Sequence, residues 1–127
     1  FDKQYRDKGY RIVSSGTRND LYFLNRQRDL MELADMTISN NIGTHIGYSI
    51  CLGTPHYIFD QEIIEIKKTA SAHASDHLQE IRDREYAEIK SVFNSRESVI
   101  TPEQIAMVKK YWGPFKIKPK FYANIKE

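Results

Sequence analysis

The segment Ser39–Phe59, SNNIGTHIGYSICLGTPHYIF, decides how the fold of this chain is predicted. It begins with small polar residues, continues with an apolar run that contains glycines, and ends with a second apolar run after Gly-Thr-Pro. The first run predicts a helix over residues 42–52, because Asn40 or Asn41 is suited to cap its start and Gly53 to close it. A buried helix that follows small polar residues is the feature from which the rest of the chain is interpreted.

Strand and helix patterns alternate on both sides of this helix. Residues 36–39 and 55–59 are short and β-prone, and Pro55 opens the second, where a missing N–H is tolerated. Tyr10–Ser15 predicts another strand, and the apolar spacing over 24–34 predicts a helix. Strands that alternate with helices indicate a parallel sheet, and strands without polar alternation are typical of burial on both faces. We therefore expect an α/β fold with helices on both faces of a parallel sheet.

The 127 residues suffice for one domain. A doubly wound domain usually opens with a strand, whereas the charged start of this chain predicts a helix that ends at Gly9. We therefore expect residues 1–60 to form the core without its first strand, as part of a larger protein. Residues 61–127 are expected to form a mostly helical part of the same domain.

Two helices are predicted in this second part. The apolar positions after Leu78 have helical spacing, with charged residues on the other face. The sequence Thr101-Pro102-Glu103-Gln104 predicts a capping box with proline in the first turn, and Gly113 ends the helix that follows.

Composition excludes several classes of function. The net charge of +2 is too near neutral to indicate a nucleic-acid partner. The sequence has no apolar run of about 18 residues to span a membrane, and its start lacks a signal-peptide core. The single Cys51 excludes an internal disulfide. We expect a cytoplasmic protein and leave peripheral contact with the inner face of the membrane open.

The polar residues before the central helix predict an anion site. The first N–H groups of a helix lack internal partners and carry partial positive charge, and open α/β sheets bind ligands at this edge. Gly43 leaves room for a ligand to approach the backbone, and His45 is able to donate to an oxyanion. The hydroxyl and amide groups offered to phosphate or sugar oxygens belong to Ser39, Asn40, Asn41 and Thr44. The alternative, equally supported by composition, is that these residues only cap the helix.

A second polar segment follows the strand predicted at 10–15. It consists of Ser14, Ser15, Gly16, Thr17 and Arg18. Because neighbouring parallel strands end at the same edge, both segments are expected to face one crevice, where the guanidinium would bind phosphate as a fork of donors. A polar turn with a solvated arginine is the simpler alternative, and for Arg18 alone it is favoured. Gly47 is assigned to close helix–sheet packing rather than to ligand contact.

The stretch DLYFLNRQRDLMELADMTISNNIGTHIGYSICLGTPHYIF, residues 20–59, resembles the donor-binding half of GT-B-type glycosyltransferases of bacterial capsule and lipopolysaccharide biosynthesis. In that family an FLxxxxxLMxxAD helix leads into a strand, and an SNxxGTxxxYxxxLGxP block then holds the nucleotide-sugar. The matching positions here are Ala34-Asp35, Ser39-Asn40, Gly43-Thr44, Tyr48, Leu52-Gly53 and Pro55. The resemblance covers residues 9–60 and, more loosely, 99–113.

The resemblance implies a Rossmann-like nucleotide-sugar-binding domain, one half of a GT-B fold, in a glycosyltransferase that makes a surface polysaccharide. The implied partners are a nucleotide-sugar, a saccharide or lipid-linked acceptor, and a missing N-terminal domain that supplies the acceptor site. The implied task of Ser39, Thr44 and the helix N–H groups is to stabilise the departing nucleotide phosphate, with His45 as the candidate catalytic group and Tyr48 beside them. No cofactor or metal is expected, and the sequence has no Asp-x-Asp pair.

Other readings stay open. A nucleotide-sugar epimerase would share the fold, but it would need carboxylates near the site. A non-catalytic α/β interaction domain would use the same loops only as caps. His73 and His77, with Asp76 between them, have helical spacing but lack a clear third ligand, so solvated histidines are favoured over a metal site. The basic and aromatic tail after Gly113 is expected to pack its aromatic rings on the domain and to keep its lysines in water.

Overall fold

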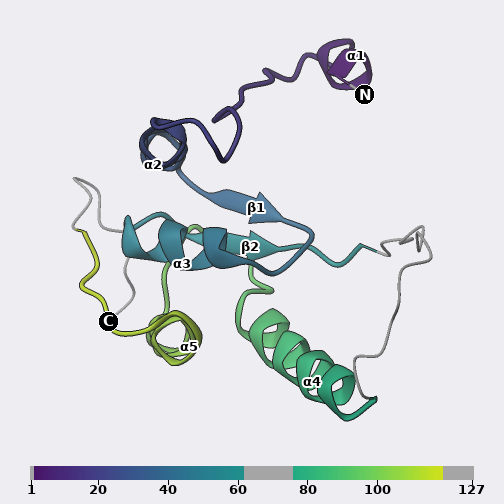
Figure 1. The fold of residues 1–127 in the computed structure, drawn as a ribbon, viewed down its shortest axis with the longest axis vertical. Helices are drawn as coiled ribbons and strands as arrows, with labels where there is room; N and C mark the ends of the chain where they lie inside the picture. Colours follow the sequence, from purple (N-terminus) through teal and green to yellow (C-terminus); the bar gives the residue numbers. More distant parts are fainter. Residues whose placement is uncertain (1, 62–75, 119–127) are drawn as a thin grey trace.

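The computed structural model describes residues 2–61 and 76–118. This part is a mixed α/β structure (Figure 1). Its elements in chain order are α1 (Asp2–Arg6), α2 (Phe23–Leu33), β1 (Thr37–Ser39), α3 (Thr44–Cys51), β2 (His56–Ile58), α4 (Asp76–Val92) and α5 (Pro102–Trp112).

The two strands form a parallel pair joined through α3. Thr37 lies beside His56 and Ser39 beside Ile58 in the register. The amide of Thr37 donates to the Pro55 carbonyl at 2.9 Å, and the amide of Phe59 donates to the Ser39 carbonyl at 2.9 Å. The strands predicted at 36–39 and 55–59, their parallel pairing and the helix between them are therefore confirmed.

The strand predicted at 10–15 is wrong. These residues form irregular backbone between α1 and α2, and two of their β-prone side chains are exposed, Tyr10 at 62% and Val13 at 67%. A strand is stable when a neighbour pairs with its backbone and covers one of its faces. Since the sheet of the described residues has two strands, β1 and β2, the structure supports a parallel α/β unit and no larger sheet.

The core lies where α3 meets β2, α4 and α5. Its buried apolar residues are Ile46, Ile50, Ile58, Ile89, Phe93, Ile100, Met107 and Val108. Gly47 lies against α5, because a Cβ added there would be 3.3 Å from the ring of Trp112. Gly47 therefore serves close packing, as predicted, but its neighbour is another helix and not the sheet. The amide of Ile58 donates to the Phe93 carbonyl at 2.8 Å and fastens the end of α4 to β2.

The other predicted helices are present. The segment 24–34 forms α2, and the residues around Leu78 form α4. At the start of α5 the Thr101 hydroxyl accepts from the Gln104 amide, and the Gln104 side chain accepts from the Thr101 amide, both at 3.2 Å. The predicted capping box is therefore confirmed.

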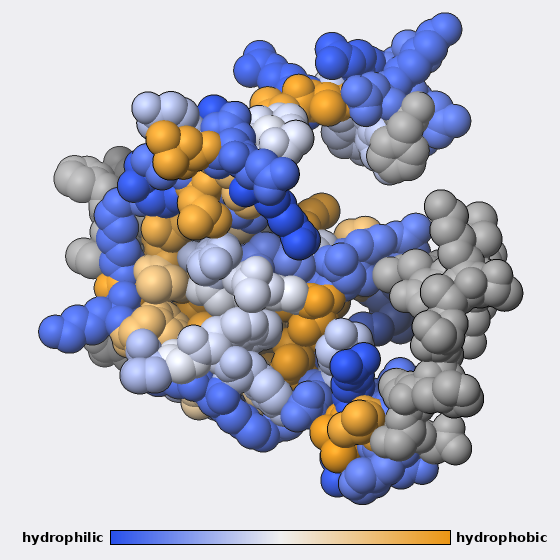
Figure 2. Space-filling model, in the orientation of Figure 1, coloured by the Kyte–Doolittle hydropathy of each residue, from blue (hydrophilic) through white to orange (hydrophobic). Residues whose placement is uncertain are grey.

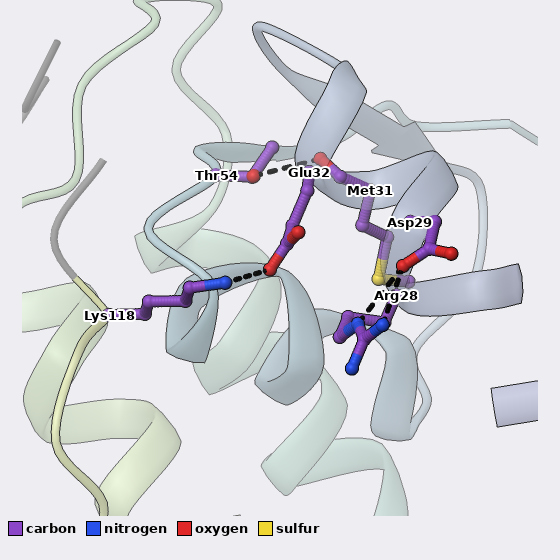
Figure 3. A network of polar contacts seen from close by, with 6 residues as sticks. All are labelled: Arg28, Asp29, Met31, Glu32, Thr54 and Lys118. Atoms are coloured by element: carbon purple, nitrogen blue, oxygen red, sulfur yellow. Dashed lines mark hydrogen bonds and ion pairs between the residues drawn. The ribbon is translucent and has the colours of Figure 1, made fainter. Parts of the chain in front are cut away.

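Helix α2 is fastened to the body by polar contacts (Figure 3). The Thr54 hydroxyl donates to the Met31 carbonyl at 3.0 Å, and the ammonium of Lys118 pairs with the carboxylate of Glu32. The amide of Lys118 also donates to the Cys51 carbonyl, the last of α3, at 2.8 Å. The chain after α5 therefore returns to both α2 and α3.

No helix within residues 2–61 and 76–118 is long and apolar enough to cross a membrane. The predicted behaviour of the tail concerns mainly residues 119–127, which lie outside the described residues.

Candidate functional site

The polar segment after β1 lies at the carboxyl end of the strand, as predicted (Figure 1). Contacts within the segment and to the chain after β2 fix its course. The Ser39 hydroxyl lies 2.8 Å from the Asn41 carbonyl, and the Asn40 amide group donates to the Gln61 side chain at 2.9 Å. The segment therefore reaches the start of α3 in a defined conformation.

The predicted cap by Asn40 or Asn41 is wrong. The N-cap of α3 is Gly43, whose backbone is extended and which forms no side-chain cap bond. The amide of Asn40 is engaged with Gln61 instead, and the segment places two further residues between Asn41 and Thr44, the first helical residue. The N-terminus of α3 is thus left without a side-chain acceptor of its own, which is the arrangement in which an external anion can supply one.

Gly43 has a steric role that the sequence does not reveal. A Cβ added at this position would lie 2.9 Å from Nδ1 and 3.1 Å from Cε1 of His45. Because the backbone of Gly43 is extended, with φ of −170°, any residue could adopt its conformation. The absent side chain therefore makes room for the His45 imidazole, which folds back over the start of α3.

A buried histidine, His56, connects the two strands at this site. It is the first residue of β2 and is 3% exposed. Its Nδ1 lies 2.7 Å from the Thr37 hydroxyl, and its Nε2 lies 2.9 Å from the Ser39 hydroxyl. Both hydroxyls come from β1, where residues 37 and 39 project to the same face. His56 thus contacts the hydroxyl of the candidate site residue Ser39 from the buried interior.

The network continues beneath α3. The Thr37 hydroxyl lies 2.5 Å from that of Ser49, which donates to the Thr54 carbonyl at 2.9 Å. Ser49 and Thr54 are completely buried. Sequence reasoning missed His56, Thr37 and Ser49, although a histidine at the start of an otherwise apolar strand was the available signal.

The two histidines of the site are both driven towards the neutral form. Burial is the main cause that lowers the pKa of His56 to about 4, and the nearby His45 lowers it further. Burial also lowers the pKa of His45, while a hydrogen bond to the backbone of Asn41 opposes this shift. The rings lie with centroids 5.5 Å apart. Among the described residues, the buried Nε2 of His45 has no hydrogen-bond partner.

The second predicted segment, 14–18, is engaged with α2. The Ser14 hydroxyl accepts from the Gly16 amide at 3.0 Å, and the Ser15 carbonyl accepts from Nε of Arg26 at 2.9 Å. Gly16 has a φ of +87°, so the turn favours glycine there. Thr17 and Arg18 are exposed. With no strand at 10–15, sheet pairing does not bring this segment to Ser39, and its part in the site stays a prediction.

The remaining predicted residues lie along α3. Thr44 is exposed at its first position. Tyr48 is 45% exposed and lines two apolar grooves, one towards α2 with Leu24 and Met31 and one towards α5 with Trp112. Tyr48 therefore flanks the site on the side of the helices.

No group of three or more histidine, cysteine, aspartate or glutamate side chains among the residues described could hold a metal ion. Of the two histidines considered for a metal, His73 lies outside the described residues, and His77 is exposed in α4.

Comparison of the chain with known protein families, with curated proteins and with solved structures gives no match. The geometry of the site and the sequence resemblance therefore carry the functional argument.

Proposed function

We propose that this chain is the nucleotide-sugar-binding half of a GT-B-type glycosyltransferase, Rossmann-like in its complete form, that transfers a sugar to a surface polysaccharide of a bacterium. The observation that carries the proposal is the β1–α3–β2 unit. It places the Ser39–Thr44 segment at the carboxyl end of a parallel strand and at the uncapped N-terminus of a helix. This is the place at which open α/β sheets hold phosphorylated ligands.

The chemistry asked of this half is electrostatic. When the sugar leaves, negative charge grows on the nucleotide phosphate, and preorganised donors stabilise it at no cost of reorientation. The available donors are the first N–H groups of α3, the exposed Thr44 hydroxyl and the Ser39 hydroxyl, which is already fixed by two contacts. His45, folded over Gly43, could add a further proton donor beside the helix start.

The decisive test is a titration of the chain with CMP, UDP, GDP and dTDP, followed by NMR of the backbone amides. We expect one nucleotide to shift the amide resonances of residues 39–48. The amide resonances of residues 14–18 should shift as well if the second segment contributes. Shifts spread over the surface, or no shift in a folded sample with any of the four, would count against a donor site here.

A matched pair of asparagine variants sharpens the test. Asn41 and Asn94 are both exposed, the first in the site segment and the second after α4. Asn41→Ala is expected to weaken nucleotide binding at least fivefold, and Asn94→Ala to leave the dissociation constant unchanged. Equal effects of the two variants would show that the segment after β1 has no special part in binding.

One observation favours the second candidate, an interaction domain. Large apolar side chains are exposed, among them Leu21 at 86%, Leu33 at 83% and Ile38 at 61%. Figure 2 shows apolar surface on the flank of α2 and α3. Exposed apolar surface of this kind suits contact with a further domain or protein. Binding of a partner without any nucleotide binding would favour this candidate.

A further inference from the structure

Five short hydrogen bonds form one chain beneath the candidate site, and a longer contact of 3.4 Å, from the Thr37 hydroxyl to the Pro55 carbonyl, branches from it. The chain runs from the Asn41 carbonyl through the Ser39 hydroxyl to Nε2 of His56, and from Nδ1 of His56 through the Thr37 and Ser49 hydroxyls to the Thr54 carbonyl. All five distances lie between 2.5 and 2.9 Å. Both ends are carbonyls, which accept protons and never donate them.

The number of protons does not match the number of links. Three hydroxyls and a neutral imidazole supply four protons, whereas five links need one proton each. His56 is neutral because its buried position disfavours the charged ring. One link must therefore stay empty, and only two arrangements leave the empty link at an end of the chain.

The two arrangements differ in the tautomer of His56. If Nε2 carries the proton, it donates to Ser39, and Ser39 donates outward, while the link from Ser49 to Thr54 stays empty. If Nδ1 carries the proton, it donates to Thr37, and each hydroxyl donates to the next group as far as the Thr54 carbonyl. The Ser39 hydroxyl then donates inward to Nε2. The Ser39 proton is available to a ligand only in the first arrangement.

The second arrangement is favoured in the absence of ligand. It leaves empty the link to the Asn41 carbonyl, whose residue is exposed and also accepts from the His45 imidazole. The first arrangement would leave the carbonyl of Thr54 without the Ser49 proton, in a residue with no exposed surface. An unpaired buried polar group costs more than an exposed one.

We propose that His56 is the positioning residue of the anion site, and that its tautomer sets whether the Ser39 hydroxyl donates inward or towards a bound phosphate oxygen. The resting tautomer has the proton on Nδ1, and an anion at Ser39 selects the tautomer with the proton on Nε2. In the change, Nδ1 gives one proton to water, Nε2 takes one from water, and the three hydroxyls rotate. The number of protons and the charge stay the same. The ligand part rests on the proposed function; the link between tautomer and chain does not.

The test is the tautomer itself, read from the nitrogen-15 resonances of His56, in which the protonated and bare ring nitrogens are far apart. In each of two variants, every remaining link of the hydrogen-bond chain can carry a proton, but the two variants need opposite tautomers of His56. Thr37→Val leaves three protons and three links, and all three links are filled only if Nε2 carries the ring proton. Ser39→Ala also leaves three protons and three links, and all three links are filled only if Nδ1 carries the ring proton. We expect Nδ1–H in the natural chain and in Ser39→Ala, and Nε2–H in Thr37→Val.

The same tautomer in both variants would overturn the link between His56 and its hydroxyl partners, and Nε2–H in the natural chain would overturn the resting state. Inorganic phosphate and pyrophosphate then test the ligand part, because either anion is expected to move the natural chain to Nε2–H. If the anion binds at residues 39–45 without changing the tautomer, the positioning role fails. If neither anion binds there although the variants behave as expected, the proposed function fails, but the dependence of the His56 tautomer on its hydroxyl partners still holds.

Discussion

At the scale of single residues, the site depends on two histidines that burial drives towards the neutral form. His56 is enclosed between the strands and uses both ring nitrogens, whereas His45 occupies the space that Gly43 leaves beside the helix start. A neutral, buried imidazole positions the Ser39 hydroxyl without adding a competing charge. The precision of Ser39 therefore depends on a residue 17 positions away in the sequence.

The buried His56 makes the stability of the protein depend on pH. Its pKa is about 4 in the folded chain and about 6.5 when exposed, so the unfolded state binds the extra proton between these values. The stability that His56 contributes is therefore complete above about pH 6.5, falls as the pH drops towards 4, and loses about 3 kcal/mol over that range. Urea unfolding measured at each pH checks this. His56→Gln should flatten the slope, and the same slope in that variant would contradict the role of His56.

The residues of the site were predicted from the sequence only in part. Ser39, Thr44 and His45 were found because a polar segment before an apolar helix is a local pattern. His56, Thr37 and Ser49 were missed because their contacts join residues 12 to 19 positions apart, and such contacts exist only once β1 and β2 have paired. The cap at Gly43 was missed because His45 competes for the space, which no local pattern reports.

At the scale of elements, local signals and neighbours decided which predictions were right. The start of α5 was predicted in detail because the capping box uses residues within one turn. The strand at 10–15 was wrong because strand formation needs a partner, and β-prone residues without one stay irregular. The α2 and α4 predictions needed only apolar spacing, and both helices formed.

The capping box at α5 gives a prediction for this element. Thr101→Ala removes the acceptor for the Gln104 amide and is expected to lower the free energy of unfolding by about 1 kcal/mol. Thr101→Ser keeps the hydroxyl and should lose much less. Denaturant unfolding of the two variants checks this, and an equal loss in both would mean that the methyl group, and not the cap, stabilises the helix.

At the scale of the whole molecule, the buried core that stabilises the fold lies in the part of the described chain from α3 onwards. The buried apolar residues belong to α3, β2, α4, α5 and the segments next to them, whereas α1 and α2 have no buried residue. Figure 1 shows α1 apart from the other elements. The region of α3 to α5 therefore provides the packing that holds the site segment.

A comparison of two large-to-small substitutions tests this distribution. Phe93 has no exposed surface, so Phe93→Ala is expected to cost about 3–5 kcal/mol of unfolding free energy. Leu33 is 83% exposed, and Leu33→Ala should change stability by less than about 0.5 kcal/mol. Thermal unfolding followed by circular dichroism measures both. A large loss for Leu33→Ala would show that α2 is part of the stable unit.

The return of the chain from α5 to α3 has a consequence for synthesis on the ribosome. The Cys51 carbonyl receives the amide of Lys118, and Gly47 packs against Trp112, so α3 is completed by residues made more than 60 positions later. The strands and α3 emerge first but cannot finish their packing until translation has passed Lys118. During that interval their apolar faces are open, and a nascent chain paused there is the form that most needs a chaperone.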